Sequence, residues 1–287
     1  MVKNMKISEV IEKMHEFHQP YTEGKKTRDK ILYGNANQQC TGIAVTATAN
    51  FDVLQKAVKE GVNLIISHEG ITYNYEKLYD VDEVDNDVLQ AKLKYIRDND
   101  LCIWRDHDHM HGSGGPHVTE RLRNDMIFYG TMEELGWKPY CVSDPKKPLW
   151  FEIPETTAEQ LADELMEKWN LNGLRIVGNR NAVIKTVFFA EHVIASEFNK
   201  FDIPKIDACR KADCIIPFEI VDYTLTQYVR DAAFMGQNKV MFEMGHFTAE
   251  ELGMKYLVKL LPEFFGNQFK VVYIQSGDTF DYQLRKR

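Results

Sequence analysis

Short apolar runs alternate with amphipathic segments along this chain. The apolar run 42–47 predicts a strand, and the apolar positions of 51–60 recur at helical spacing. Asn50 is a good cap for that helix, and Gly61 a good stop. A second apolar run at 62–66 predicts the next strand. Strand, helix and strand in this order predict a parallel sheet covered by helices.

The same alternation continues to the end of the chain and predicts an α/β fold. Further helices are predicted at 7–17, 84–98, 157–169, 222–235 and 248–261, and further strands at 101–104, 149–153, 174–178, 184–189, 214–218, 239–242 and 269–274. The last two strands and the helix between them predict a terminal β-α-β unit. Three prolines within 138–148 mark the best boundary. We therefore expect an N-terminal α/β lobe at 1–137 and a C-terminal α/β lobe at 138–287.

Composition narrows the class of protein. The 287 residues carry a net charge of −8, which argues against a nucleic-acid surface, since that would show a basic patch. No run of 18 apolar residues exists, so we expect no membrane span. The start turns polar too early for a signal peptide. Five cysteines without a CxxC pair favour free, mostly buried thiols, and hence a cytoplasmic protein.

Histidines and carboxylates follow three of the predicted strands. His68 and Glu69 come directly after one strand, the segment 106–111 follows the next, and His246 and Glu250 lie four apart near the last helix. Ligands bind at the carboxyl ends of strands in open α/β sheets. Divalent zinc, iron or manganese accepts imidazole and carboxylate ligands. The candidate ligands for one or two ions are His68, Glu69, His111, His246 and Glu250, with Asp106, His107 and Asp108 in reserve.

Each cluster alone also has a simpler explanation. His68 could end a buried strand, and the alternating histidines of 107–111 could form a solvated loop face. Thr248 and Glu251 fit a capping box, which leaves Glu250 for the metal. His15, His18 and His192 are isolated in the sequence, so a structural role or simple exposure is expected for them. Any one cluster could lie at a strand end by chance, but that all three do so by chance is much less favoured.

At these residues the chain resembles the Nif-three-like dinuclear metal-centre family, whose bacterial members are often labelled GTP cyclohydrolase I type 2. The resemblance runs over nearly the whole chain. It is carried by the opening helix and by the segments 42–45, 63–68, 107–115, 174–178 and 245–250. The last segment is the most specific, because the family has a ligand His and, four residues on, a ligand Glu there. These positions are His246 and Glu250.

The departures from the family pattern are specific. Two consecutive family histidines fall on His68 and Glu69, and a family His-x-x-x-Asp falls on His107 and His111. One imidazole has thus become a carboxylate and one carboxylate an imidazole, which we interpret as a compensated swap. Family positions that line the cavity fall on Glu219 and on changed residues nearby, so the substrate is expected to differ.

The resemblance implies two α/β lobes with two divalent metal ions (zinc, iron or manganese) in the cleft between them. It also implies a homohexamer, a trimer of dimers with its sites facing the interior. The first hypothesis is a dinuclear metal-dependent hydrolase, with cyclohydrolase action on a purine nucleotide or related small molecule as the candidate reaction. His107 and then Glu219 are the candidate acid–base residues. The alternatives are a non-catalytic metal-delivery or regulatory hexamer, and a ligand-binding protein whose histidine cluster is a coincidence.

Overall fold

The computed structural model describes residues 5–22, 27–73, 86–115, 121–193 and 202–284. The chain divides into two compact units. The first comprises Met1–Gly130 with Gly253–Ser276, and the second comprises Thr131–Leu252 with Gly277–Arg287. The division falls inside two helices, α4 (Met126–Leu135) and α8 (His246–Phe264).

The first unit is built on a five-stranded sheet of order β1-β4-β3-β2-β10. Only β1 is antiparallel to its neighbour; the other pairings in the sheet are parallel. Its strands are β1 (Lys30–Gly34), β2 (Ile43–Thr46), β3 (Leu64–Ser67), β4 (Cys102–Arg105) and β10 (Val271–Tyr273), and its other helices are α1 (Ile7–Phe17), α2 (Phe51–Glu60) and α3 (Asp87–Asp98).

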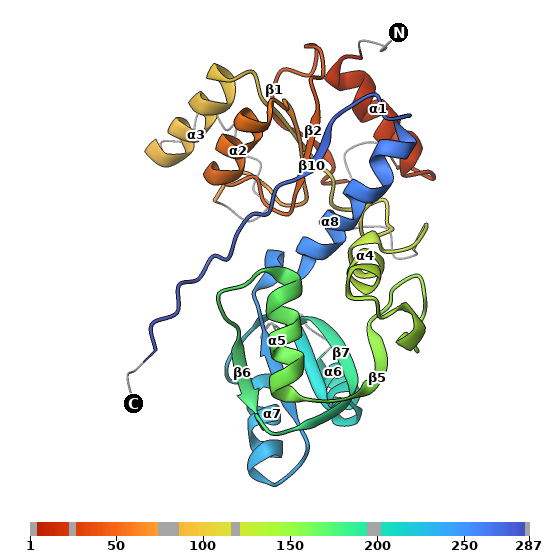
Figure 1. The fold of residues 1–287 in the computed structure, drawn as a ribbon, viewed down its shortest axis with the longest axis vertical. Coiled ribbons are helices and arrows are strands. Elements are labelled where there is room, and N and C mark those ends of the chain that lie inside the picture. The colour runs from red at the N-terminus through yellow and green to blue at the C-terminus, as the bar shows by residue number, and fades with distance from the viewer. Residues whose placement is uncertain (1–4, 23–26, 74–85, 116–120, 194–201, 285–287) are drawn as a thin grey trace. The chain divides into compact units, whose positions relative to one another are not determined.

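Helices α2 and α3 cover one face of this sheet. Their apolar residues form one buried cluster with residues of β2, β3 and β4. The Asn50 side chain accepts the Val53 N–H at the start of α2, and Gly61 ends that helix at a φ of 71°. Helix α1 and the C-terminal part of α8 lie on the other side of the sheet (Figure 1), where the rings of Phe17 and Phe264 are 5.2 Å apart.

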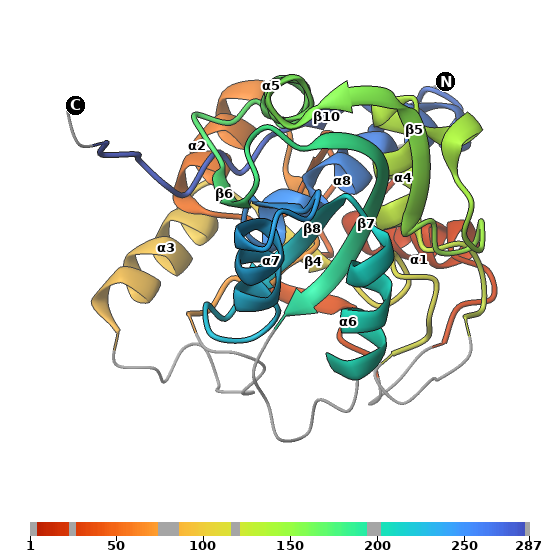
Figure 2. The same cartoon turned by 90° about the horizontal axis from the view of Figure 1, so that it is seen from below.

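The second unit has a five-stranded sheet of order β5-β7-β8-β9-β6. The three central strands are parallel, and the two edge strands are antiparallel to their neighbours. Its strands are β5 (Trp150–Thr157), β6 (Arg175–Gly178), β7 (Val183–Val193), β8 (Cys214–Ile220) and β9 (Val240–Glu243). Its helices are α5 (Ala158–Trp169), α6 (Asp202–Lys211), α7 (Leu225–Phe234) and the 3₁₀ turn η1 (Lys138–Tyr140). Helices α6 and α7 lie beside β7 and β8 (Figure 2) and share a buried apolar cluster with them.

Most predicted elements are confirmed, and so is the mixed α/β class. Residues 84–85 of one predicted helix lie outside the described residues. So does His117, for which the sequence predicts the start of a helix. The predicted terminal β-α-β unit is wrong, because β9 belongs to the second sheet and β10 to the first. The predicted capping box is wrong too, since α8 begins at His246 and Thr248 lies inside its first turn.

For the cysteines, the sequence predicts free, mostly buried thiols. All five cysteines are free thiols, and Cys102, Cys209 and Cys214 are buried as predicted. Among the residues that the structure describes, no helix is long and apolar enough to cross a membrane.

Candidate metal centre

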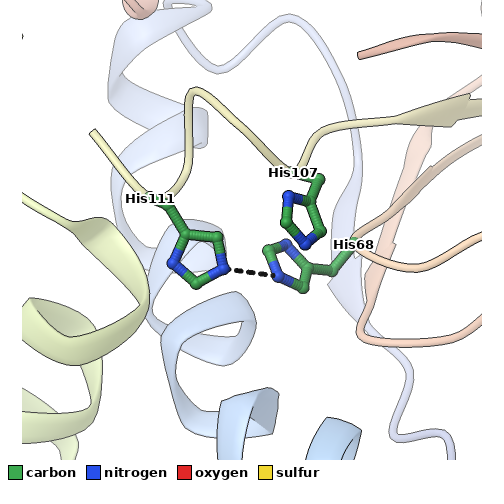
Figure 3. Close-up of side chains that lie close together, drawn as sticks. All are labelled: His68, His107 and His111. Atoms are coloured by element: carbon green, nitrogen blue, oxygen red, sulfur yellow. Dashed lines mark hydrogen bonds between the residues drawn. The ribbon is translucent and has the colours of Figure 1, made fainter. Parts of the chain in front are cut away.

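Three histidines of the first unit gather beyond the carboxyl ends of β3 and β4 (Figure 3). His68 directly follows β3, while His107 and His111 lie on the loop after β4. The two strands are parallel and end in register, with Ser67 paired to Arg105. One nitrogen from each ring lies within 4.8 Å of the others, and the Nε2 atoms of His68 and His111 are 3.2 Å apart.

An oxygen atom faces the Nδ1 atom of each ring. The contacts are His68 with the Asp106 carbonyl at 3.0 Å, His107 with Asp108 at 3.1 Å and His111 with Asp125 at 3.2 Å. An acceptor at Nδ1 holds the ring proton there and leaves a lone pair on Nε2. This is the tautomer of a histidine that binds metal through Nε2, with its other nitrogen held by an oxygen.

The distance between the two Nε2 atoms fits a shared ion. Two lone pairs 3.2 Å apart repel each other unless a cation lies between them or one ring takes a second proton. Nitrogens bound to one zinc at 2.0–2.1 Å with tetrahedral angles would be about 3.3 Å apart. His68 and His111 therefore have the chemistry and the spacing of two ligands of one metal ion.

His107 lies beside this pair in a different way. Its ring stacks on that of His68, with centroids 4.4 Å apart and planes 14° apart. Because a metal ion lies in the plane of the imidazole that binds it, two stacked parallel rings cannot hold the same ion. Burial, followed by the neighbouring His68 and His111, lowers the pKa of His107 well below its usual value. His107 is thus a neutral imidazole next to the His68–His111 pair.

The other polar residues of the loop are engaged by protein groups. Asp106 is buried against His18, with 2.7 Å between Oδ2 and Nε2. Asp108 accepts the backbone N–H of Arg28 at 2.6 Å and its Nε–H at 2.8 Å. The Nε2 atom of His109 accepts the backbone N–H of Thr22 at 2.9 Å. The reserve ligands Asp106 and Asp108 therefore have structural partners here.

Two aspartates that the sequence analysis missed hold the loop. Asp29 accepts the backbone N–H groups of His107 and Asp108 at 2.8 Å each and that of His109 at 3.0 Å. Burial raises the pKa of Asp29, but hydrogen bonds from His109 and His107 outweigh it and bring the pKa to about 2. Asp125 faces His111 with Oδ2, while its Oδ1 accepts two N–H groups at the start of α4. An aspartate just before an apolar helix is the one signal that could have singled out Asp125.

Glu69 is paired within the first unit. Arg105 donates from Nη2 to Glu69 at 3.0 Å and from Nε to the His68 carbonyl at 3.0 Å. The arginine thus fixes the backbone on which both predicted ligands lie.

In the second unit, the predicted pair His246 and Glu250 lies one turn apart on α8. His246 Nε2 is 3.5 Å from Glu250 Oε2, and Glu250 is buried. Ligand atoms of a tetrahedral ion at bond lengths of 2.0–2.2 Å would be about 3.4 Å apart. The i, i+4 spacing therefore produces a second pair of suitable geometry, which contains one imidazole and one carboxylate.

Glu219 on β8 lies against this second pair. Its two oxygens face the Nδ1 atoms of His192 and His246, each at 2.7 Å. Burial raises the pKa of Glu219, but hydrogen bonds from His192 and His246 outweigh it and lower the pKa to about 2. His192 is isolated in the sequence. The pairing of β7 with β8 brings it here, and residue spacing alone does not reveal that pairing.

The structure is thus a mixed α/β protein with groups of histidines and carboxylates that could hold a metal ion. Residues 5–99 match the sequence model of the DUF34/NIF3 family (NGG1p interacting factor 3). No curated protein sequence matches the chain.

Solved structures with the same fold cover nearly the whole chain. A Bacillus cereus protein related to NIF3 has a TM-score of 0.66 at 13% identity, over 98% of this chain and 100% of that one. The protein ybgI, of unknown function, has a TM-score of 0.64 at 18% identity, over 94% and 98%. Reduced HcgD from Methanocaldococcus jannaschii has a TM-score of 0.59 at 15% identity, over 98% and 100%. Over residues 5–99 the chain is similar to the DUF34/NIF3 family, and nearly the whole chain has the fold of these structures.

Proposed function

We propose that this protein is a divalent-metal-dependent hydrolase. The observation that carries the proposal is the pair of Nε2 atoms on His68 and His111, 3.2 Å apart, with each Nδ1 held by an oxygen. Such a pair is unfavourable without a cation and well suited to one. Neutral imidazoles and carboxylates suit zinc, iron or manganese.

The ligands in this proposal come from the predicted set. His68 and His111 would hold an ion in the first unit, and His246 with Glu250 would hold one in the second. We keep Glu69 among the proposed ligands, although its carboxylate forms an ion pair with Arg105. When bound, a divalent ion supplies Lewis acidity and lowers the pKa of a coordinated water toward neutrality.

His107 is the residue we assign to proton transfer. It stacks on His68, is held through Nδ1 by Asp108, and lies beside the ligand pair without sharing its ion. A fixed, neutral imidazole in this position could accept the proton of a water bound to a metal ion held by His68 and His111. Glu219 instead contacts two histidines, a position that supports an orienting role over proton transfer.

The substrate class and the assembly rest on the family resemblance. We assign the reaction to the ring of a purine nucleotide or a related small molecule, within a homohexamer built as a trimer of dimers. Light scattering measures the mass of the assembly directly, and six times the 33.4 kDa chain is the expected value.

The test compares metal-loaded wild-type protein with His68→Ala and His107→Gln variants. Each is incubated with a panel of purine nucleotides, including GTP, and the products are identified by mass spectrometry. We expect His68→Ala to lose metal and turnover together, and His107→Gln to keep metal and lose turnover. Bound metal without turnover of any nucleotide would favour the alternative, a metal-delivery or regulatory scaffold.

A further inference from the structure

A pocket of about 360 Å³ lies between the first turns of α2 and α3 in the first unit. Phe51 begins α2, while Asp87 and Val88 begin α3. The lining is made of Phe51, Tyr73, Asp87, Val88, Ala91 and Lys92. Pockets of this volume accept small molecules, and none of these residues belongs to the candidate metal pairs.

Most of the pocket lining is apolar. Phe51, Tyr73 and Val88 are 44%, 58% and 59% exposed. The Phe51 ring packs against that of Tyr95 on α3, with ring centroids 4.9 Å apart. Single exposed apolar residues are ordinary, but several around one hollow form a surface that a ligand with an apolar body can cover.

Lys92 is the one cationic residue of the lining, and it is only 4% exposed. Its Nζ donates to the Ile71 carbonyl at 3.2 Å and lies 5.7 Å from the centre of the Tyr73 ring. An ammonium has three N–H donors, so one carbonyl leaves donors to spare. Burial lowers the pKa of Lys92 to about 8, and no carboxylate among the described residues offsets this effect. A buried ammonium without a counter-ion is unfavourable, so an anion in the pocket would be stabilised by Lys92.

The ends of two helices add positive potential to the pocket. First-turn residues of both α2 and α3 line it, and the N-terminal end of a helix favours negative charge. Asp87 is the one carboxylate of the lining. It is exposed, and its Oδ1 accepts the backbone N–H of Val88 at 2.9 Å. Asp87 therefore interacts with the end of its own helix and leaves the charge of Lys92 unbalanced.

We propose that this pocket binds a small carboxylate with an aromatic or branched apolar body. The carboxylate would pair with Lys92, and the body would cover Phe51, Tyr73 and Val88. A single amine matches one negative charge, whereas a phosphate dianion would meet Asp87 without a second cation in the lining. The proposal is independent of the metal binding in the proposed function. Without an anion the buried lysine costs stability, which is common where a residue serves binding.

The experiment is isothermal titration calorimetry of the full, zinc-loaded chain at pH 7 with 2-naphthoate and with its neutral analogue 2-naphthamide. We expect Lys92→Met to weaken naphthoate binding by about 10–100-fold, because the variant loses a charged hydrogen bond in an apolar pocket. Naphthamide should bind wild type and Lys92→Met equally weakly. Lys94→Met is the matched control, since Lys94 lies on the same helix, is exposed and is paired with Asp98. This control should bind naphthoate like wild type.

Two further variants separate this pocket from other sites. His68→Ala should keep the naphthoate affinity of wild type, because the carboxylate is not expected at the candidate metal centre. Asp87→Asn should keep or raise that affinity, because it removes the one carboxylate of the lining. Thermal unfolding of each variant is the fold control, and Lys92→Met should be at least as stable as wild type.

Four results would overturn the proposal. Wild type could fail to bind naphthoate, or Lys92→Met could bind it as tightly as wild type does. A loss in His68→Ala with normal binding in Lys92→Met would place the carboxylate at the metal centre. A loss in Asp87→Asn would show that the ligand is held through Asp87 instead of Lys92.

Discussion

Replacing Asp125 by Asn should inactivate His111 as a ligand while leaving the helix intact. Asp125 uses Oδ1 to accept the N–H groups of Ile127 and Phe128 at 3.1 and 3.2 Å, which caps α4. Its Oδ2 faces His111 Nδ1 at 3.2 Å and accepts from Arg121 at 2.9 Å. Asn keeps the first acceptor and puts an NH₂ group where the second one was. The His111 ring then carries its proton on Nε2, the atom needed for the metal.

The Asp125 carboxylate both orients His111 and caps α4, so zinc affinity and stability should respond differently to its replacement. Loss of an orienting partner typically weakens metal binding by about 10–100-fold, or roughly 1.4–2.7 kcal/mol. Asn and Asp are nearly equal as helix caps, so Asp125→Asn should lose only the ion pair with the partly exposed Arg121, which is roughly 1 kcal/mol or less of metal-free stability. Asp125→Ala loses both roles and should cost about 1 kcal/mol more in the metal-free protein.

The assay has two parts. Competition with a chromophoric chelator measures the zinc dissociation constant, and urea unfolding of the metal-free protein measures stability. We expect Asp125→Asn to separate the two readouts, with weak zinc binding and near-normal stability. Equal zinc affinity in wild type and Asp125→Asn would refute the tautomer argument for the whole cluster.

Three further predictions concern the fold. Burial lowers the pKa of Lys92 from 10.5 to about 8, so its charge costs stability below pH 8 and this cost disappears as the pH rises to about 10.5. Lys92→Met should therefore raise the free energy of unfolding at pH 7 by up to about 3 kcal/mol. The variant should also lack the rise in stability that wild type shows between pH 8 and about 10.5. Urea titrations at several pH values measure both effects. Glu191→Gly should keep or raise the free energy of unfolding, because glycine accepts a φ of 54°. Glu191→Val should lose about 1–2 kcal/mol in the same urea titration. Equal stabilities of the two variants would show that the backbone at this position is not strained. A Cβ on Gly253 would lie 2.4 Å from the Ile127 Cα. Gly253→Ala should therefore lower the stability measured by thermal unfolding by about 1–3 kcal/mol. An unchanged melting temperature would contradict the close packing of α8 on α4.

The sequence predicts elements well where a local signal exists. Asn50 and Gly61 bound α2 as expected, because an N-cap and a left-handed stop are local features. Strand β1 at Lys30–Gly34 went unpredicted. It is an edge strand in which no residue is fully buried, and its apolar run, Ile31 to Tyr33, is only three residues long. The assignment of β10 to the first sheet depends on its pairing with β2, and a strand's choice of sheet leaves no trace in its own periodicity.

The candidate site also contains residues that local spacing predicts and residues that only long-range contacts bring together. The spacing of His246 and Glu250 on a helix forces them to face each other, so this pair could be predicted. His68 and His111 needed only the parallel ends of β3 and β4. Asp29 and His192 are brought to their clusters by contacts across 80 and 27 residues, with His109 and Glu219 respectively. No spacing rule reaches that far, which is why the residues that orient the candidate ligands were missed.

The metal content of untagged protein is the most direct test of whether the candidate ligands bind metal. Elemental analysis should compare wild type with His68→Ala and His246→Ala, purified in parallel without an affinity tag. We expect about two divalent ions per wild-type chain and a loss of metal in each variant. Wild-type protein without bound metal, which also fails to take up zinc, would contradict it.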